Sequence, residues 1–173
     1  MQKAGRAASG LNDRVAVAFG MLRLTLAALH LIALGLGLGA VIARGTALRE
    51  APTTGSLRRA FRADTMWGIA AGLWIGTGLW RWLGATEKAT GYYLSNHYFL
   101  GKMGFLVLIL ILEVAPMITL IRWRKALGGG AQPETVHQAA AAKRIAVISH
   151  VQALLVVLIV FFAAAMARGY GAR

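Results

Sequence analysis

The chain has 173 residues, of which 58% are hydrophobic, and its formal charge is +13 because 19 Lys and Arg residues outnumber 6 Asp and Glu. An ordinary soluble domain is about 45–50% apolar, so this composition excludes a soluble globular fold and predicts an integral membrane protein. Four membrane spans of about 20 residues would use roughly half of the length, so we expect one transmembrane domain, residues 1–173, without a separate catalytic domain.

Four apolar segments predict membrane-spanning helices. The first, residues 15–43, is too long for the apolar core of a signal peptide. The second, residues 66–83, is short and ends in a Trp-Arg-Trp sequence that is typical of a helix end at lipid head groups. The third and fourth are residues 99–121 and 145–167. The sequence therefore predicts an all-α fold, an integral membrane four-helix bundle.

The basic residues lie mainly between the apolar segments and form no basic helix, so a nucleic acid is not an expected partner. The loops after the first and third segments carry more Lys and Arg than the opposite side, which predicts that these loops are cytoplasmic and that both termini face outward. We therefore expect a multi-pass membrane protein, with the lipid bilayer and its anionic head groups as the first partner.

Glycines recur at intervals of four residues in two of the predicted spans. They are Gly35 and Gly39 in the first span, and Gly68, Gly72 and Gly76 in the second. Small residues at this spacing allow helix backbones to approach closely in a membrane. These faces predict contacts between helices of one chain, or between the subunits of a homo-oligomer.

Ionisable side chains inside a predicted span cost at least about 2.5 kcal/mol, so each needs a partner or a purpose. His30 lies in the outer third of the first span, and Lys102 enters the third span from the same side, so both are expected in one site. Imidazole is a common iron ligand in helical-bundle cytochromes, which makes His30 a candidate metal ligand for haem b. Ala33 and Gly37 would leave a flat surface beside the imidazole for a macrocycle. A histidine that joins helices through a hydrogen bond is the alternative.

The other candidate residues of this outer site are Lys102, Met103 and Met166. Lys102 is a candidate partner for an anionic propionate or substrate carboxylate, or a proton-transfer group; the alternative is a lysine that extends to the interface. Met103 and Met166 lie near the same level and are candidates for a second iron ligand, with plain packing as the alternative. The chain has no cysteine, which excludes covalently attached haem and thiolate metal sites.

A second group of polar residues is expected in the cytoplasmic half. Glu113 lies roughly 16 Å further along the helix than Lys102. His150 enters the last span from the cytoplasmic side, and Arg62 and Asp64 precede the second span there. We expect Arg62, Asp64, Glu113 and His150 to form an inner polar cluster, which is either a salt-bridged network or a proton path.

Nearly the whole chain resembles a family of predicted bacterial membrane proteins of unknown function, through segments such as AALHLIALGLGLGAVIARG, LRRAFRADTMWGIAAGLWIGTGLWRW and EKATGYYLSNHYFLGKM. More distantly it is similar to the four-helix bacterial protoporphyrinogen IX oxidases, which also have an ALH histidine in the first span and a lysine at the start of the third. In that family the histidine is associated with b-type haem and the lysine with activity. The two resemblances therefore imply a multi-pass protein of a bacterial inner membrane, a haem role for His30 and a catalytic role for Lys102.

These observations lead to two functional hypotheses. In the first, the protein binds haem b at an outward-facing site and acts in electron transfer or in oxidation of a hydrophobic or porphyrin-like substrate, with a quinone as a candidate partner. In the second, it is a haem-free structural or transport-associated membrane protein, in which the same residues join helices through hydrogen bonds.

Overall fold

The computed structural model describes residues 2–84 and 90–171 and contains no strand in these ranges. Helices account for most of the described residues, so the predicted all-α class is confirmed. The helices in chain order are α1 (Gln2–Ala47), α2 (Thr54–Leu83), α3 (Thr90–Ser95), α4 (His97–Gly128), α5 (Pro133–Val136) and α6 (Ala139–Ala167).

Three of the described helices are long and apolar enough to cross a membrane. They are α1 over Arg14–Ala47, α4 and α6, and they contain the first, third and fourth predicted spans. The predicted second span, residues 66–83, lies in α2, which is not among these three. Its apolar residues alternate with glycine, tryptophan and threonine, which lower the mean hydropathy. A membrane bundle of four helices therefore stays a prediction.

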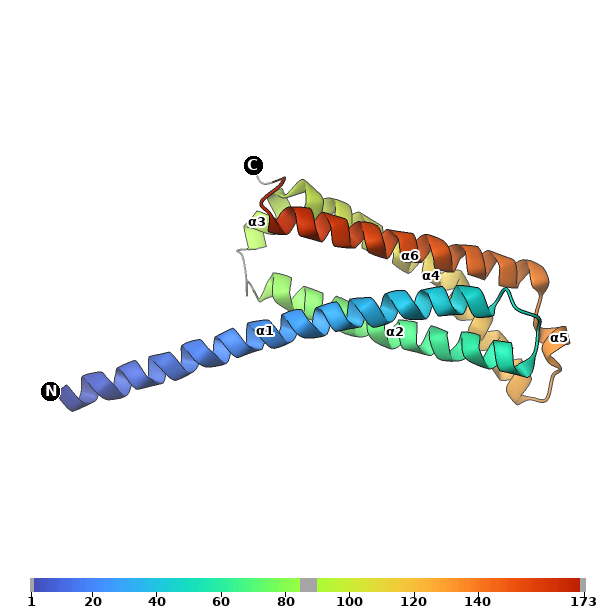
Figure 1. The fold of residues 1–173 in the computed structure, drawn as a ribbon, viewed down its shortest axis with the longest axis horizontal. Helices are drawn as coiled ribbons and strands as arrows, with labels where there is room; N and C mark the ends of the chain where they lie inside the picture. Colours follow the sequence, from blue (N-terminus) through green and yellow to red (C-terminus); the bar gives the residue numbers. More distant parts are fainter. Residues whose placement is uncertain (1, 85–89, 172–173) are drawn as a thin grey trace.

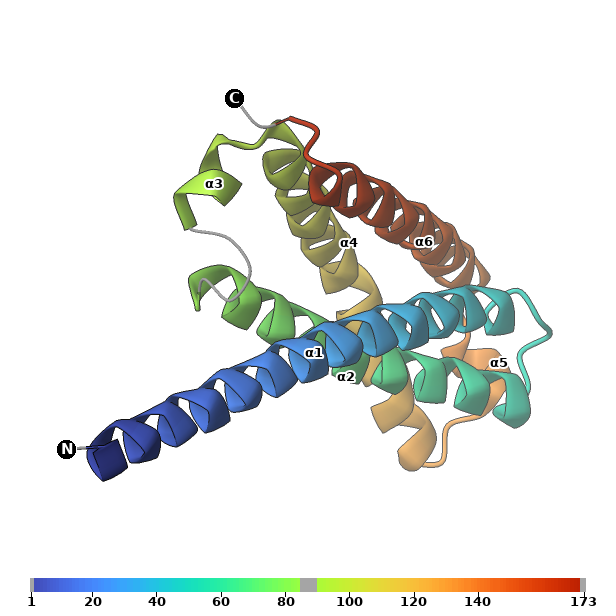
Figure 2. The same cartoon turned by 60° about the vertical axis from the view of Figure 1, so that its left-hand side comes forward.

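The long helices are arranged as two pairs. Helix α1 packs along α2, and α4 packs mainly against α6, while the C-terminal half of α1 also contacts α6 (Figure 1). The two pairs diverge toward the end of α2 that leads to α3, and the N-terminal part of α1 extends beyond the other helices (Figure 2). The short α5 lies at the opposite end, beside the loop between α1 and α2.

Local sequence determines where α2 and α4 begin. Thr53 and Ser56 form a capping box, in which Ser56 N donates to Thr53 Oγ1 at 3.1 Å and Thr53 N donates to Ser56 Oγ at 3.0 Å. Asn96 caps α4 by accepting from Tyr98 N at 3.0 Å, and its Nδ2 donates to Tyr170 O at 3.0 Å. The buried Asn96 therefore attaches the C-terminal tail to the start of α4.

The core consists of two apolar clusters with a polar layer between them. On α1, Ala47 belongs to the cluster near α5 and Val41 to the cluster in the middle of the bundle. On α2, Phe61 and Trp67 belong to the same two clusters, respectively. Arg44 lies between Val41 and Ala47 and is fully buried, so a charged side chain separates the two parts of the core.

The outer faces of the long helices are apolar. Leu24, Ile111 and Phe161 have exposed fractions of 70%, 64% and 67%, and many other large apolar side chains are exposed. A soluble monomer rarely exposes apolar surface on this scale, whereas lipid tails would cover it. The exposed side chains therefore agree with a multi-pass membrane protein.

The spaced glycines do not join helices within the chain. A Cβ atom added at Gly35, Gly39, Gly68, Gly72 or Gly76 would meet nothing within 4 Å. That part of the glycine prediction is wrong, because the rotation of each helix places these residues on its exposed side. Association of two chains through these faces stays a prediction.

Candidate functional site

A cavity of about 440 Å³ lies between α1, α2, α4 and α6, at the end of the bundle where α3 lies. Its lining includes His30 from α1, Lys102 and Met103 from α4, and Met166 from α6. All four residues that the sequence assigned to the outer site therefore line one cavity. Its volume is within the range of about 300–1,000 Å³ that is usual for small-molecule sites. The roles of the four residues stay predictions.

A hydrogen bond to Thr77 of α2 fixes the His30 imidazole. The His30 Nδ1 atom lies 3.0 Å from Thr77 Oγ1, and that hydroxyl donates its proton to Leu73 O at 2.7 Å. A Thr77 hydroxyl that donates to Leu73 O can accept from His30 Nδ1, and the tautomer with its hydrogen on Nδ1 has its lone pair on Nε2. A histidine that binds a metal through one nitrogen is normally held in this way through the other.

The face of α1 that carries Ala33 and Gly37, which was expected to leave room for a flat macrocycle, is covered by another helix. Ala33 is 2% exposed, and a Cβ atom at Gly37 would lie 3.3 Å from a ring carbon of Trp67. That prediction is wrong, because α2 packs directly on this small-residue face of α1. The imidazole also packs closely against Gly78 of α2, where an added Cβ would be 3.1 Å from His30 Cε1.

The cavity wall is mostly apolar but contains several hydrogen-bond donors. Lys102 Nζ lies 4.8 Å from the centre of the Phe99 ring, and Arg81 also lines the cavity. The indole Nε1 atoms of Trp74 and Trp82 are buried and have no acceptor among the described residues. The positive charge of Lys102 and Arg81 in a mostly apolar wall favours an apolar molecule with anionic groups.

The residue types present are those that a haem b site uses, and haem b stays a prediction. The His30 side chain offers a ring nitrogen, the walls are mostly apolar, and Lys102 and Arg81 are positively charged. In the described part of the chain no three His, Asp or Glu side chains gather as a metal site. Haem iron needs only one or two ligands from the protein, so the absence of a three-residue metal site in the described part of the chain does not exclude haem.

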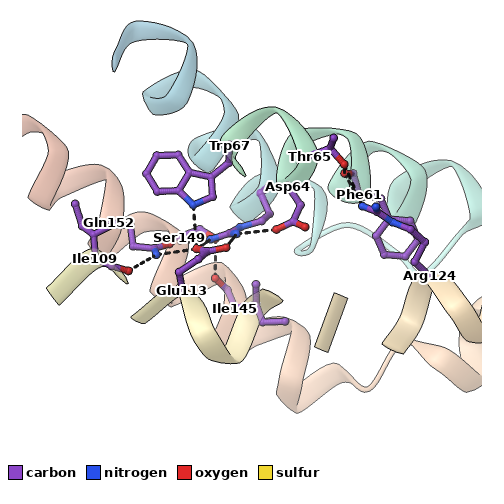
Figure 3. A network of polar contacts seen from close by, with 11 residues as sticks. Phe61, Asp64, Thr65, Trp67, Ile109, Glu113, Arg124, Ile145, Ser149 and Gln152 are labelled. Carbon is purple, nitrogen blue, oxygen red and sulfur yellow. Dashed lines mark hydrogen bonds and ion pairs between the residues drawn. The ribbon is translucent and has the colours of Figure 1, made fainter. Parts of the chain in front are cut away.

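A second site is centred on Arg44, which is 0% exposed and donates five hydrogen bonds (Figure 3). Its Nε donates to Ser149 Oγ at 3.0 Å, and Nη1 donates to Asp64 Oδ1 at 2.9 Å and Glu113 Oε1 at 2.7 Å. Its Nη2 donates to Glu113 Oε2 at 3.0 Å and to Gln152 Oε1 at 2.7 Å. The guanidinium is therefore fully hydrogen-bonded although it is buried.

Glu113 is the main acceptor of this site. Besides Arg44, it accepts from Trp67 Nε1 at 3.0 Å and from Gln152 Nε2 at 2.9 Å, both at Oε2. We call these residues the Arg44 network, which comprises Arg44, Asp64, Trp67, Glu113, Ser149 and Gln152. Because its members come from α1, α2, α4 and α6, the network joins all four long helices.

The network agrees with only part of the predicted inner cluster. Asp64 and Glu113 are members, but Arg62 is exposed and makes none of the hydrogen bonds of the network. His150 Nδ1 donates to Ala146 O of its own helix at 2.6 Å. Its ring lies against α1, because a Cβ atom at Gly45 would be 2.8 Å from His150 Cε1. The cation of the cluster is Arg44, which the sequence analysis assigned to a loop.

The environment of Asp64 affects its acidity. This residue lies just before the predicted second span. Burial raises the pKa of the Asp64 carboxyl above its usual value, and the hydrogen bond and positive charge of Arg44 oppose that shift. The neighbouring Glu113 carboxylate raises the pKa further. The neutral form of Asp64 is therefore favoured more than that of an exposed aspartate.

Comparison with known proteins places the chain in one family. A family model described as "Predicted membrane protein (DUF2214)" matches residues 22–171. The chain belongs to this family. The matched range of the DUF2214 protein includes every residue of the cavity and of the Arg44 network named above. No curated protein and no solved structure matches it. The family description therefore gives a membrane setting, without a reaction or a ligand.

Proposed function

We propose that this DUF2214 protein crosses a bacterial inner membrane four times, through α1, α2, α4 and α6. The support for α2 is its packing along α1 and the exposure of apolar side chains such as Ile69, Leu73 and Leu79. The loops next to α5 would be cytoplasmic, because most exposed basic residues are there. They are Arg49, Arg58, Arg59, Arg62, Arg122, Arg124, Lys125, Lys143 and Arg144.

We infer that the cavity binds haem b and that the protein acts in electron transfer or in oxidation of a hydrophobic or porphyrin-like substrate. The observation that carries this proposal is the His30 imidazole, which lines an apolar cavity while Thr77 accepts its Nδ1 hydrogen. A structural histidine between helices would not require a cavity of about 440 Å³ beside it. A bound haem would supply one-electron chemistry.

The residues of the chain would have distinct roles in this site. His30 would hold the iron through Nε2, and Thr77 would orient the imidazole. Lys102 and Arg81 would pair with carboxylates of the ligand, and Lys102 is the candidate for proton transfer to or from a substrate. Met103 and Met166 are the candidates for a second iron ligand. The apolar walls would exclude water, and a quinone is the candidate electron acceptor.

A haem-free structural or transport-associated protein is the second candidate. The observation that favours it is the Arg44 network, which joins four helices through buried hydrogen bonds without a cofactor. Such a network gives the buried polar residues a structural role that needs no ligand.

The haem content of two histidine variants distinguishes the candidates. His30→Ala removes the proposed ligand, whereas His97→Ala removes an exposed histidine at the start of α4. With haem supplied during expression, we expect the purified His30→Ala protein to lose most of its haem and the His97→Ala protein to retain it. Equal haem content in both variants would refute the ligand role of His30, and absence of haem from the unmodified chain would favour the haem-free candidate.

A further inference from the structure

The charges of the Arg44 network do not balance if every acid is ionised. Arg44 carries a positive charge, because a guanidinium keeps its proton in proteins. Asp64 and Glu113 both accept its hydrogen bonds, and the other members are neutral side chains. Two ionised carboxylates would leave one net negative charge within the network, on side chains that are partly buried. The positive charge of Arg124 also acts on Asp64, but the Arg124 side chain is exposed.

The two carboxyl groups are held next to each other. Asp64 Oδ1 and Glu113 Oε1 both accept from one nitrogen, Arg44 Nη1, at 2.9 Å and 2.7 Å. When two carboxyl groups share a site, repulsion between the negative charges favours protonation of one of them. One proton would make the whole network neutral.

The hydrogen bonds identify which acid holds that proton. Glu113 accepts four, two from Arg44 and one each from Trp67 and Gln152. Asp64 accepts one within the described residues, from Arg44. Hydrogen bonds to a carboxylate favour its ionised form, so of the two acids Asp64 is the better placed to hold a proton. The raised pKa of Asp64 agrees with this assignment.

Asp64 also has a route to water. Its side chain is 14% exposed and that of Glu113 is 21% exposed, whereas that of Arg44 is 0% exposed. The next residue, Thr65, is exposed, and its Oγ1 accepts from Arg124 Nη2 of α4 at 3.2 Å. On α6 the titratable residue beside the network is His150, whose Nδ1 donates to its own helix. Asp64 therefore lies between the buried cation and the basic end of the bundle.

We propose that the Arg44 network is a binding site for one proton, which Asp64 holds and exchanges with the aqueous phase at the basic end of the bundle. The proton comes from water and leaves to water, so the site needs no oxidant or other reactant. It is separate from the cavity and does not depend on haem. The protein would therefore take up and release one proton inside a membrane bundle.

Infrared difference spectroscopy of the full chain in lipid vesicles tests this proposal. A protonated carboxyl group has a C=O stretching band that shifts when water is exchanged for D₂O, and the chain has only 6 Asp and Glu residues to contribute. We expect such a band at neutral pH, with reversible loss as the pH is raised. Absence of the band at neutral pH would overturn the proposal.

Two matched variants assign the band. Asp64→Asn places a neutral amide where the neutral carboxyl lay, so we expect it to fold and to lose the band. Glu134→Gln changes an exposed acid of α5, and we expect the band to be unchanged. A band that persists in Asp64→Asn would overturn the assignment to Asp64. Failure of Asp64→Asn to fold would also contradict the proposal, because it would show that Arg44 requires a negative charge at this position.

Discussion

Arg44 of α1 and Glu113 of α4 form an ion pair across 69 positions of the sequence, with Arg44 Nη1 2.7 Å from Glu113 Oε1. A second bond joins Arg44 Nη2 to Glu113 Oε2 at 3.0 Å, so the guanidinium and the carboxylate are paired side by side. Helices α1 and α4 belong to different pairs of the bundle. This ion pair therefore connects the two halves of the molecule.

Replacement of Arg44 should destabilise the fold strongly. Arg44→Met leaves Asp64 and Glu113 buried without their cation, and loss of one partner of a buried ion pair costs about 3–5 kcal/mol. Unfolding of the detergent-purified protein by denaturant or heat measures this change. Arg49→Met is the matched control, because Arg49 is exposed and its loss should change stability by about 0.5 kcal/mol or less. Equal stability of the two variants would contradict the structural role of Arg44.

The stability of the chain should depend on the protonation of Asp64. Its pKa is raised in the folded state above the usual 3.8. The stability that neutral Asp64 contributes is therefore fully present below the unfolded pKa and is lost as the pH rises through the folded pKa. We expect the midpoint of thermal unfolding to fall over this range in the unmodified chain more than in Asp64→Asn. The same slope in both proteins would contradict the assignment.

Labelling of single cysteines should show whether α2 crosses the membrane. The chain has no cysteine, so Arg49→Cys and Leu94→Cys each provide one thiol, at exposed positions before and after α2. We expect a membrane-impermeant maleimide to label only the second in intact cells and both after permeabilisation. Arg122→Cys at the end of α4 serves as a control for the cytoplasmic side. Labelling of Arg49→Cys and Leu94→Cys from the same side would refute a fourth span.

Thr77 should affect the cofactor without touching it. Thr77→Val keeps the size of the side chain but removes the acceptor of the His30 Nδ1 hydrogen. Loss of such an orienting bond typically lowers metal affinity about 10–100-fold, so we expect weaker haem binding in a titration of the haem-depleted protein. Thr77→Ser retains the hydroxyl and should bind nearly as tightly as the unmodified chain. If all three proteins bind haem equally, Thr77 does not orient the ligand.

The sequence was sufficient for three of the predicted spans, because the length of an apolar run nearly determines whether it can cross a bilayer. The second, residues 66–83, stays a prediction. The sequence also predicted that His30 and Lys102 lie in one site, because both were expected at a similar depth on the outward side of their spans. Both residues line the same cavity in the structure. Depth along a helix can be counted from the sequence without knowledge of helix packing.

The rotation of the helices could not be predicted in the same way. Arg44 lies at the end of an apolar run and was assigned to a loop, but it points between helices and is fully buried. Gly35 and Gly39 are exposed, whereas Gly37 and Gly45 approach other helices. One signal for Arg44 was present: Glu113 lies inside a span and needs a cation at its own depth. Which arginine supplies that cation depends on which one faces the inside of the bundle, and only the packed structure shows this.

The most direct test of the proposed function is an absorption spectrum of the detergent-purified chain, oxidised and dithionite-reduced, after expression with added haem. We predict a Soret band, with α and β bands on reduction, in protein whose folding is confirmed by circular dichroism. A spectrum without these bands, from folded protein, would contradict haem binding in the His30 cavity.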